Sequence, residues 1–211
     1  MSTITLTRPA RPTVTRSNVG VGLWVFMGVA TALFTLFTAA YLMRMASSDW
    51  SSIALPWQLG LSTALLVAGS AAMQVAAAAA HRGRWPRARA WLLAGGACAA
   101  AFLGAQLWAW QALLEAHVLV SGNPAASFFY LLTAMHGLHV MGGLIAWSVT
   151  AHGAWPADRA ELALPRAAHA IALCARYWHF LLAVWVVLVA TLAGATPALV
   201  AWVCGPIGAL R

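Results

Sequence analysis

Three histidines are the residues most capable of chemistry inside the long apolar stretches of this chain. His136 and His139 lie within FFYLLTAMHGLHVMGGLIAW, residues 128–147, which carries no charged side chain. Three residues apart on a helix, they lie on one face, one above the other. His179 lies in a second apolar stretch, 40 residues after His139. Imidazole is a common ligand of haem iron and of other metals, so electron transfer through a bound haem is one function open to them.

A structural role is the alternative for these histidines. Haem ligation needs one histidine on each of two facing helices, and His136 or His139 with His179 could supply that pair. Ligating rings also need fixed acceptors to orient them, and the apolar stretches contain no carboxylate. Buried histidines in membranes bond to backbone, to hydroxyls such as that of Thr133, or to lipid. We therefore expect all three rings to be buried against polar partners, and no catalytic, metal or cofactor site in this chain.

Composition places the chain among membrane proteins. It is 63% hydrophobic and only 8% charged, with a mean hydropathy of +0.80. The net charge of +8 comes from arginine alone, and the arginines lie between apolar runs, so they indicate membrane topology and not a nucleic-acid partner. The cysteines Cys98, Cys174 and Cys204 have no CxxC spacing, which argues against a disulfide framework or a zinc site.

Five apolar runs are long enough to cross a bilayer as helices. They occupy about residues 19–42, 57–80, 90–114, 127–148 and 171–195. Residues 1–18 are rich in Thr and Pro and are expected to be a disordered cytoplasmic segment. Residues 197–211 form an apolar tail that is too short to cross again. The prediction is an all-α, polytopic membrane protein with one five-helix domain over residues 19–196.

The distribution of arginine predicts the orientation of these spans. The N-terminal segment, residues 81–89 and residues 152–176 hold three, four and three arginines, whereas the opposite side holds only Arg44 and Arg211. Arginine is enriched on the cytoplasmic side of membrane proteins. We therefore expect the N-terminus to be cytoplasmic and the C-terminus to lie outside.

The charged residues also limit the functions available. The four carboxylates, Asp49, Glu115, Asp158 and Glu161, fall in loops or at span ends. A proton or ion carrier generally needs ionisable groups inside the membrane, so transport is not expected as the primary function. The sequence contains no phosphate-binding loop, dinucleotide fingerprint or nucleophile–base constellation.

Two stretches predict how helices pack. Gly96, Ala100 and Gly104 recur at four-residue spacing, as in close contacts between membrane helices. Residues 71–80, AAMQVAAAAA, either let a neighbouring backbone come close or reflect a bias toward alanine. Gln74 is the one polar side chain there, and we expect it to bond within the bundle.

Longer motifs resemble one known family. FFYLLTAMHGLHVMGG, residues 128–143, resembles the HGLHV helix of haem-copper oxidase subunit III, and residues 177–180 with 184–185 resemble its YWHF…VW opening of the last helix. GLWVF at 22–26 and FLGAQLWAW at 102–110 extend the match over essentially the whole chain. The resemblance implies the five-helix form of that subunit, in the bacterial cytoplasmic (inner) membrane.

In that family the subunit holds no redox centre; haem and copper are expected in partner subunits. It packs beside catalytic subunit I of a cytochrome c or quinol oxidase, binds phospholipid between its helices, and supports assembly, proton uptake and durability during turnover. The residues that match its motifs are structural or lipid-contact candidates: His136, His139, Tyr177, Trp178, His179, Gln106 and Trp24.

The chain departs from the family at every membrane carboxylate. Ala30 and Ala109 stand where the family places Glu, Ala172 where it places an acidic residue, and Leu182 where it places Asp. The resemblance therefore implies a scaffold and not a proton relay. Two alternatives remain open: a subunit III-like accessory protein of a nitric oxide reductase, and a membrane b-type cytochrome that uses the three histidines.

Overall fold

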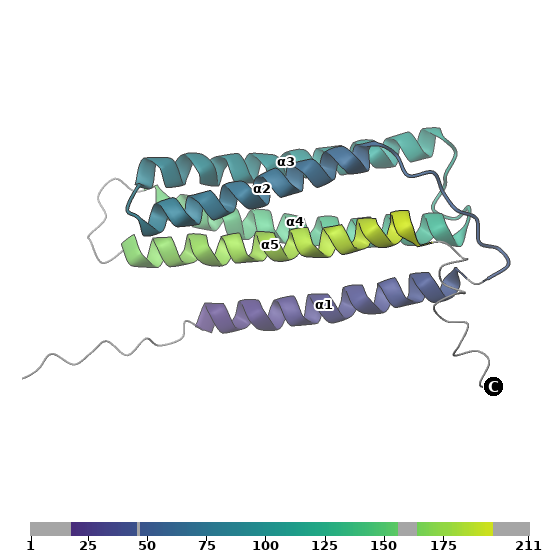
Figure 1. The fold of residues 1–211 in the computed structure, drawn as a ribbon, viewed down its shortest axis with the longest axis horizontal. Helices are drawn as coiled ribbons and strands as arrows, with labels where there is room; N and C mark the ends of the chain where they lie inside the picture. The colour runs from purple at the N-terminus through teal and green to yellow at the C-terminus, as the bar shows by residue number, and fades with distance from the viewer. Residues whose placement is uncertain (1–17, 46, 156–163, 196–211) are drawn as a thin grey trace, which may run out of the picture.

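The computed structural model describes residues 18–45, 47–155 and 164–195, and these form five long helices. The helices are α1 (Asn18–Arg44), α2 (Gln58–His81), α3 (Trp85–Glu115), α4 (Pro124–Ala154) and α5 (Leu164–Gly194) (Figure 1). Each is long and apolar enough to cross a membrane, and the described residues contain no strand. The prediction of an all-α protein with five membrane-spanning helices is confirmed, whereas its orientation stays a prediction.

Several helices are longer than the apolar runs that predicted them. α3 begins at Trp85 instead of near residue 90, and α5 begins at Leu164 instead of near 171. Hydropathy marks only the part of a helix that needs an apolar environment, while backbone hydrogen bonding continues beyond it. Asn123 caps α4, since its Oδ1 accepts from the backbone N–H of Ala126 at 3.0 Å. The predictions for residues 1–17 and 197–211 lie outside the described residues.

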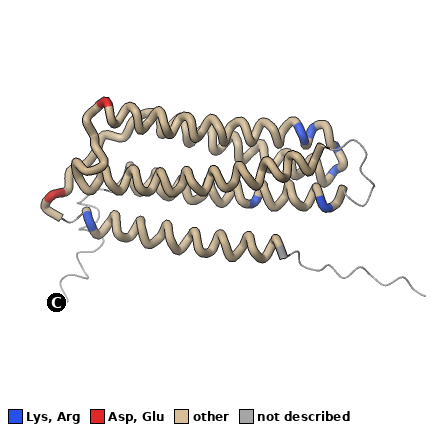
Figure 2. The backbone as a smooth tube through the Cα atoms, turned by 180° about the vertical axis from the view of Figure 1, so that it is seen from behind, with Lys and Arg blue, Asp and Glu red and all other residues tan. Residues whose placement is uncertain are grey.

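Helices α2 to α5 pack side by side as a bundle, and α1 runs along α4 and α5 (Figure 1). The loop from α2 to α3 turns through Gly83, whose φ of +70° lies in the left-handed region that glycine adopts without strain. Charged side chains gather toward the two ends of the bundle (Figure 2). At the end opposite that loop, Arg44 pairs with Asp49 at 2.7 Å.

Polar side chains join neighbouring helices at several levels. The Gln106 amide donates to the Ser62 hydroxyl at 2.8 Å, which joins α3 to α2. The indole of Trp147 on α4 donates to the Leu92 carbonyl oxygen of α3, also at 2.8 Å. Lipid tails compete well for apolar surfaces, so close packing and hydrogen bonds of this kind hold membrane helices together.

The close contacts of α3 do not follow the predicted glycine stripe. Gly96 is buried, and a Cβ built there would lie 2.2 Å from the ring of Trp147. Ala100 and Gly104 are exposed instead, and a Cβ on Gly104 would meet nothing within 4 Å. The neighbouring position Gly95 contacts Met73 of α2. The prediction of one Gly96–Ala100–Gly104 contact stripe is therefore wrong, because α2 and α4 each meet α3 on a different face.

This contact pattern predicts opposite effects for two glycine substitutions on α3. Gly96→Ala would push the indole of Trp147 away and strain its bond to Leu92, so we expect the free energy of unfolding to fall by about 1–3 kcal/mol. Gly104→Ala is the matched control and should be neutral or stabilising by up to about 1 kcal/mol, since alanine favours helix. Unfolding by SDS titration in mixed micelles measures both. Equal losses for the two variants would contradict this contact pattern.

Candidate functional site

His136 lies at the centre of the bundle among aromatic rings. Its side chain is 0% exposed. Its ring centroid is 5.0 Å from that of Trp185, 5.7 Å from that of Phe102 and 6.2 Å from that of Phe34. Neither ring nitrogen has a hydrogen-bond partner among the described residues. The prediction of burial is confirmed, but the prediction of a polar partner is wrong for this histidine.

The hydroxyl expected to serve His136 is already occupied. Thr133 lies one turn earlier on α4, where its Oγ1 accepts from the Trp110 indole at 3.1 Å and donates to the Phe129 carbonyl oxygen at 2.7 Å. The surroundings of His136 are therefore apolar and aromatic. Such an environment disfavours a charged ring and leaves a neutral one without hydrogen bonds.

His139 faces helix α1 and is half-buried. Its Nδ1 lies 2.7 Å from the carbonyl oxygen of Met135, so Nδ1–H donates to the backbone of its own helix. The ring lies between two aromatic residues of α1, with centroids 5.8 Å from Phe26 and 5.2 Å from Phe34. A polar partner is confirmed here, although it comes from α4 itself and not from another helix.

His179 joins α5 to α2 on the outside of the bundle. Its Nδ1 is hydrogen-bonded to the hydroxyl of Ser70, and its Nε2 lies 3.0 Å from the amide oxygen of Gln74. The polar partners expected for His179 and Gln74 are thus confirmed. Both side chains are exposed, however, so the prediction that His179 is buried within the bundle is wrong.

The other candidate residues have structural contacts. Tyr177 is buried, and its hydroxyl donates to the His139 carbonyl oxygen at 3.0 Å, which joins α5 to α4. Trp178 is 0% exposed, and its indole nitrogen has no partner among the described residues. Trp24 is 61% exposed, with the guanidinium of Arg176 at 5.6 Å from its ring. Gln106 is buried and bonds to α2, as described above.

The three histidines do not form a cofactor site. His136 faces the aromatic centre, His139 faces α1, and His179 bonds to α2, so neither histidine of α4 faces His179 of α5. Within residues 18–45, 47–155 and 164–195, no three His, Cys, Asp or Glu side chains are grouped closely enough to hold a metal ion. The residues present therefore do not fit a haem held by a histidine pair.

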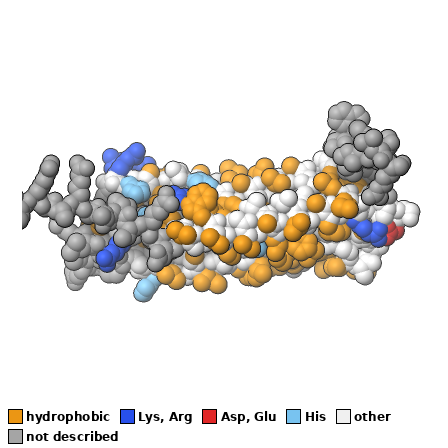
Figure 3. All heavy atoms as spheres, turned by 90° about the horizontal axis from the view of Figure 1, so that it is seen from below, with side chains coloured by type: hydrophobic (Ala, Val, Ile, Leu, Met, Phe, Trp, Pro, Cys, Tyr) orange, Lys and Arg blue, Asp and Glu red, His pale blue; other side chains and the backbone are white. Residues whose placement is uncertain are grey.

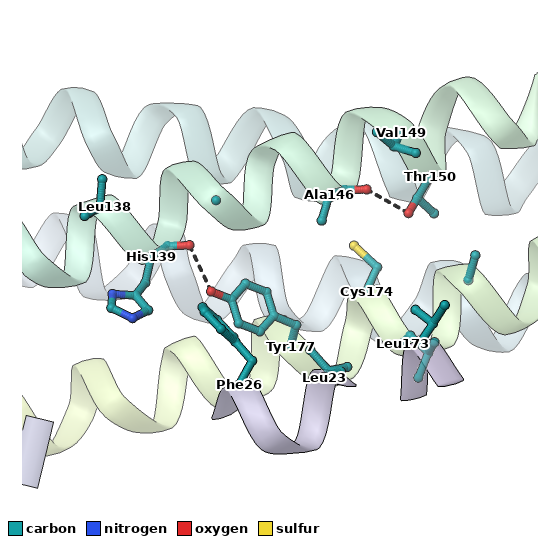
Figure 4. A pocket seen from close by; sticks show the side chains of 13 residues that line it. Leu23, Phe26, Leu138, His139, Ala146, Val149, Thr150, Leu173, Cys174 and Tyr177 are labelled. Carbon is teal, nitrogen blue, oxygen red and sulfur yellow. Dashed lines mark hydrogen bonds between the residues drawn. The ribbon is translucent and has the colours of Figure 1, made fainter. Parts of the chain in front are cut away.

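A groove lies between α1, α4 and α5. This groove has a volume of about 720 Å³. Its wall is almost entirely apolar and includes Leu23, Leu138, Ala146 and Leu173 (Figure 4). Its lining also includes His139 and Tyr177, and Figure 4 marks the bond from the tyrosine hydroxyl to the histidine carbonyl. Hydrophobic side chains cover the middle of the face that carries α1, with charged ones toward its two ends (Figure 3).

Comparison with known proteins decides the family. No family model matches the chain. It is 30% identical to the probable cytochrome c oxidase subunit 3 of Nocardia farcinica, over 82% of this chain and 86% of that protein. It is also 29% identical to the cytochrome bo(3) ubiquinol oxidase subunit 3 of Pseudomonas aeruginosa, over 80% and 81% of the two chains. For the cytochrome c oxidase subunit 3 of Alkalihalophilus pseudofirmus the identity is 28%, over 84% and 87%. The chain belongs to the subunit III family of the haem-copper oxidases.

In this subunit III, Ala30 of α1, the position at which the resemblance implied a glutamate in the family, lies beside the α4 histidines. Ala30 is 3% exposed and lies one turn from both Phe26 and Phe34, the two residues whose rings flank His139. The small methyl group of Ala30 therefore faces this part of α4. Ala30 and the unpartnered ring of His136 lie in the same apolar region of this subunit III.

Sequence reasoning missed two features of this subunit III. The groove is built from three helices that are distant in sequence, and no local motif marks it. Ser70 was also missed as the partner of His179, because a serine within an alanine-rich helix gives no signal of its own. The exposed position of His179 and Gln74 required knowledge of which faces of α2 and α5 meet.

The unpartnered ring of His136 predicts that phenylalanine is tolerated there. His136→Phe removes two buried polar atoms while keeping an aromatic ring against Trp185 and Phe102, so we expect the free energy of unfolding to rise by about 1–3 kcal/mol. Thr133→Val is the contrasting variant and should lower it by about 1 kcal/mol, because the Trp110 indole loses its acceptor. SDS titration measures both. A loss above about 1 kcal/mol for His136→Phe would show that the histidine has a polar partner.

Proposed function

We propose that this chain is a non-catalytic subunit III of a respiratory terminal oxidase in the bacterial cytoplasmic membrane. It supports the assembly and stability of the catalytic subunit and holds phospholipid. The observation that carries the proposal is the separation of His179 from the two histidines of α4, because no pair on facing helices is aligned for proton or electron transfer. Haem and copper then belong to the partner subunits.

The absence of carboxylates from the middle of the described spans supports the same function. Asp49 lies in the loop after α1, and Glu115 is the last residue of α3. A proton relay needs groups that gain and lose a proton near working pH. The aromatic residues around His136 also leave it no hydrogen-bonded connection to the ends of the bundle. Packing and lipid retention are the contributions that this arrangement supports.

The groove between α1, α4 and α5 supports the lipid part of the proposal. Its apolar wall fits an acyl chain, and its lining extends from His139 to Val19, near the start of α1. Trp24, near that end, provides an amphipathic ring that suits the interface. The guanidinium of Arg176, 5.6 Å from that ring, provides a positive charge on a long side chain that suits an anionic head group.

A second candidate differs in partner and not in fold. The loss of every family carboxylate, at Ala30, Ala109, Ala172 and Leu182, favours a divergent branch that accompanies a nitric oxide reductase. The identity of the catalytic subunit that co-purifies with this chain separates the two candidates.

Removal of the chain should shorten the working life of its complex without changing proton uptake. We expect the complex to assemble poorly or to lose activity over successive turnovers, because packing and lipid contacts are lost. The pH dependence of the early-turnover rate should change little. Early rates measured against pH, with and without the chain, test this. A shift of about one unit or more in the apparent pKa would contradict a role limited to packing.

A bulky residue in the groove should displace lipid. Gly142 lines the groove, and a Cβ there would meet nothing within 4 Å, so Gly142→Phe fills the groove without disturbing a helix contact. Gly104→Phe is the matched control, at an equally open position outside the groove. Native mass spectrometry of the complex should find at least one phospholipid fewer with Gly142→Phe only. The same number of lipids in both variants would overturn the lipid proposal.

A further inference from the structure

The polar cluster formed by Ser70, Gln74 and His179 leaves hydrogen-bond donors unused. An amide oxygen can only accept, so the ring nitrogen facing Gln74 Oε1 is the protonated one, and the Ser70 hydroxyl then donates to Nδ1. The amide nitrogen of Gln74 has no hydrogen-bond partner among the described residues, and its side chain is exposed. The cluster therefore presents amide N–H donors to whatever lies outside α2 and α5.

The cluster lies far from both ends of its helices. By residue number, Ser70 is at the middle of α2 (Gln58–His81) and His179 at the middle of α5 (Leu164–Gly194). At 1.5 Å per residue, each is roughly 17–22 Å from either end. Serine and histidine side chains are too short to reach the head groups from such a position, unlike the long side chain of Arg176 one turn away. Exposed polar groups at this depth are unfavourable against hydrocarbon.

The surface around the cluster combines small exposed residues with exposed polar side chains at the middle of the helices. On α2 the exposed stripe that includes Gln74 consists of Gly60, Ala64, Val67 and Ala71, and on α5 the stripe from His179 continues through Ala183, Val186 and Ala190. Large hydrophobic residues are exposed at only two positions on each of these helices, against five on α3 and five on α4. Small residues with a polar side chain are typical of helix–helix contacts in membranes, whereas bulky apolar residues suit lipid.

We propose that this α2–α5 face, turned toward the viewer in Figure 1, is the surface by which the subunit docks to its complex. Its occupant is a transmembrane helix of a different polypeptide, one that presents a hydrogen-bond acceptor opposite the Gln74 amide. The acceptor chemistry follows from the unused donors, and a helix follows from the small residues that let a backbone approach closely. This inference rests on the proposed function, since it requires a partner within the membrane.

Photo-crosslinking in intact membranes tests the face directly. A benzophenone-bearing amino acid is introduced singly at Ala71 or Val186 on the docking face, and at Leu93 or Ile145 on the faces of α3 and α4 as matched controls. After irradiation, adducts are identified by mass and by peptide sequencing. We expect Ala71 and Val186 to crosslink to another polypeptide, and Leu93 and Ile145 to give no protein adduct.

The other outcomes have different consequences for this inference and for the proposed function. Protein adducts at Leu93 or Ile145 alone would overturn the docking face while leaving membership of a complex intact. Adducts to a second copy of this chain would overturn the choice of a different polypeptide. An absence of protein adducts at all four positions would overturn the inference and would also count against the proposed function.

Two substitutions extend the test to affinity. Gln74→Leu removes the donors, and we expect the amount of partner retained on the affinity-tagged chain to fall roughly three- to fifteenfold, the range for one hydrogen bond between membrane helices. Ala71→Leu should lower it further by keeping the partner helix away. Ala97→Leu is the control, at an exposed position on α3. Equal retention for Ala71→Leu and Ala97→Leu would contradict the proposal.

Discussion

The side chain of Trp185 fixes the positions of four helices at once. It is 0% exposed, and its ring centroid lies 5.0 Å from that of Phe102 on α3 and 5.0 Å from that of His136 on α4. Its indole nitrogen donates to the Thr63 hydroxyl of α2 at 3.0 Å. In a membrane, packing of this kind replaces the hydrophobic driving force of a soluble core. The remaining contacts among α2, α3, α4 and α5 are arranged around this residue.

The aromatic centre of the bundle is filled by packed rings, and the grooves lie elsewhere. The rings around His136 leave it no hydrogen-bonded connection to other polar groups in the described residues, so the middle of the bundle suits packing alone. Two openings lie instead along α1: the 720 Å³ groove beside α4 and α5, and a second one of about 530 Å³ beside α5. The polar cluster that could meet another protein lies on α2 and α5, away from the groove at His139. The proposed lipid groove and the proposed docking face are therefore separate surfaces.

The sequence predicted the features that depend on neighbouring residues along the chain. Runs of about twenty apolar residues determine a membrane-spanning helix, and the spacing of His136 and His139 determines that both lie on one side of α4. The sequence could not predict which other helix each face of a helix contacts. Gly96 and Gly104 share one stripe, yet only Gly96 lies against another helix, because α4 meets α3 at Trp147. His136 was expected to find a polar partner, but the hydroxyl of Thr133 nearby serves Trp110. Such choices are settled by packing between helices that are distant in sequence.

The central claim is that this subunit III holds no redox centre of its own. The most direct test is a reduced-minus-oxidised spectrum of the complex purified through a tag on this chain, recorded again after mild detergent has separated the chain from its partner. The account predicts that all haem absorbance remains with the partner and that the separated chain shows no haem band. A haem band that stays with the chain and disappears in His136→Ala would contradict the account.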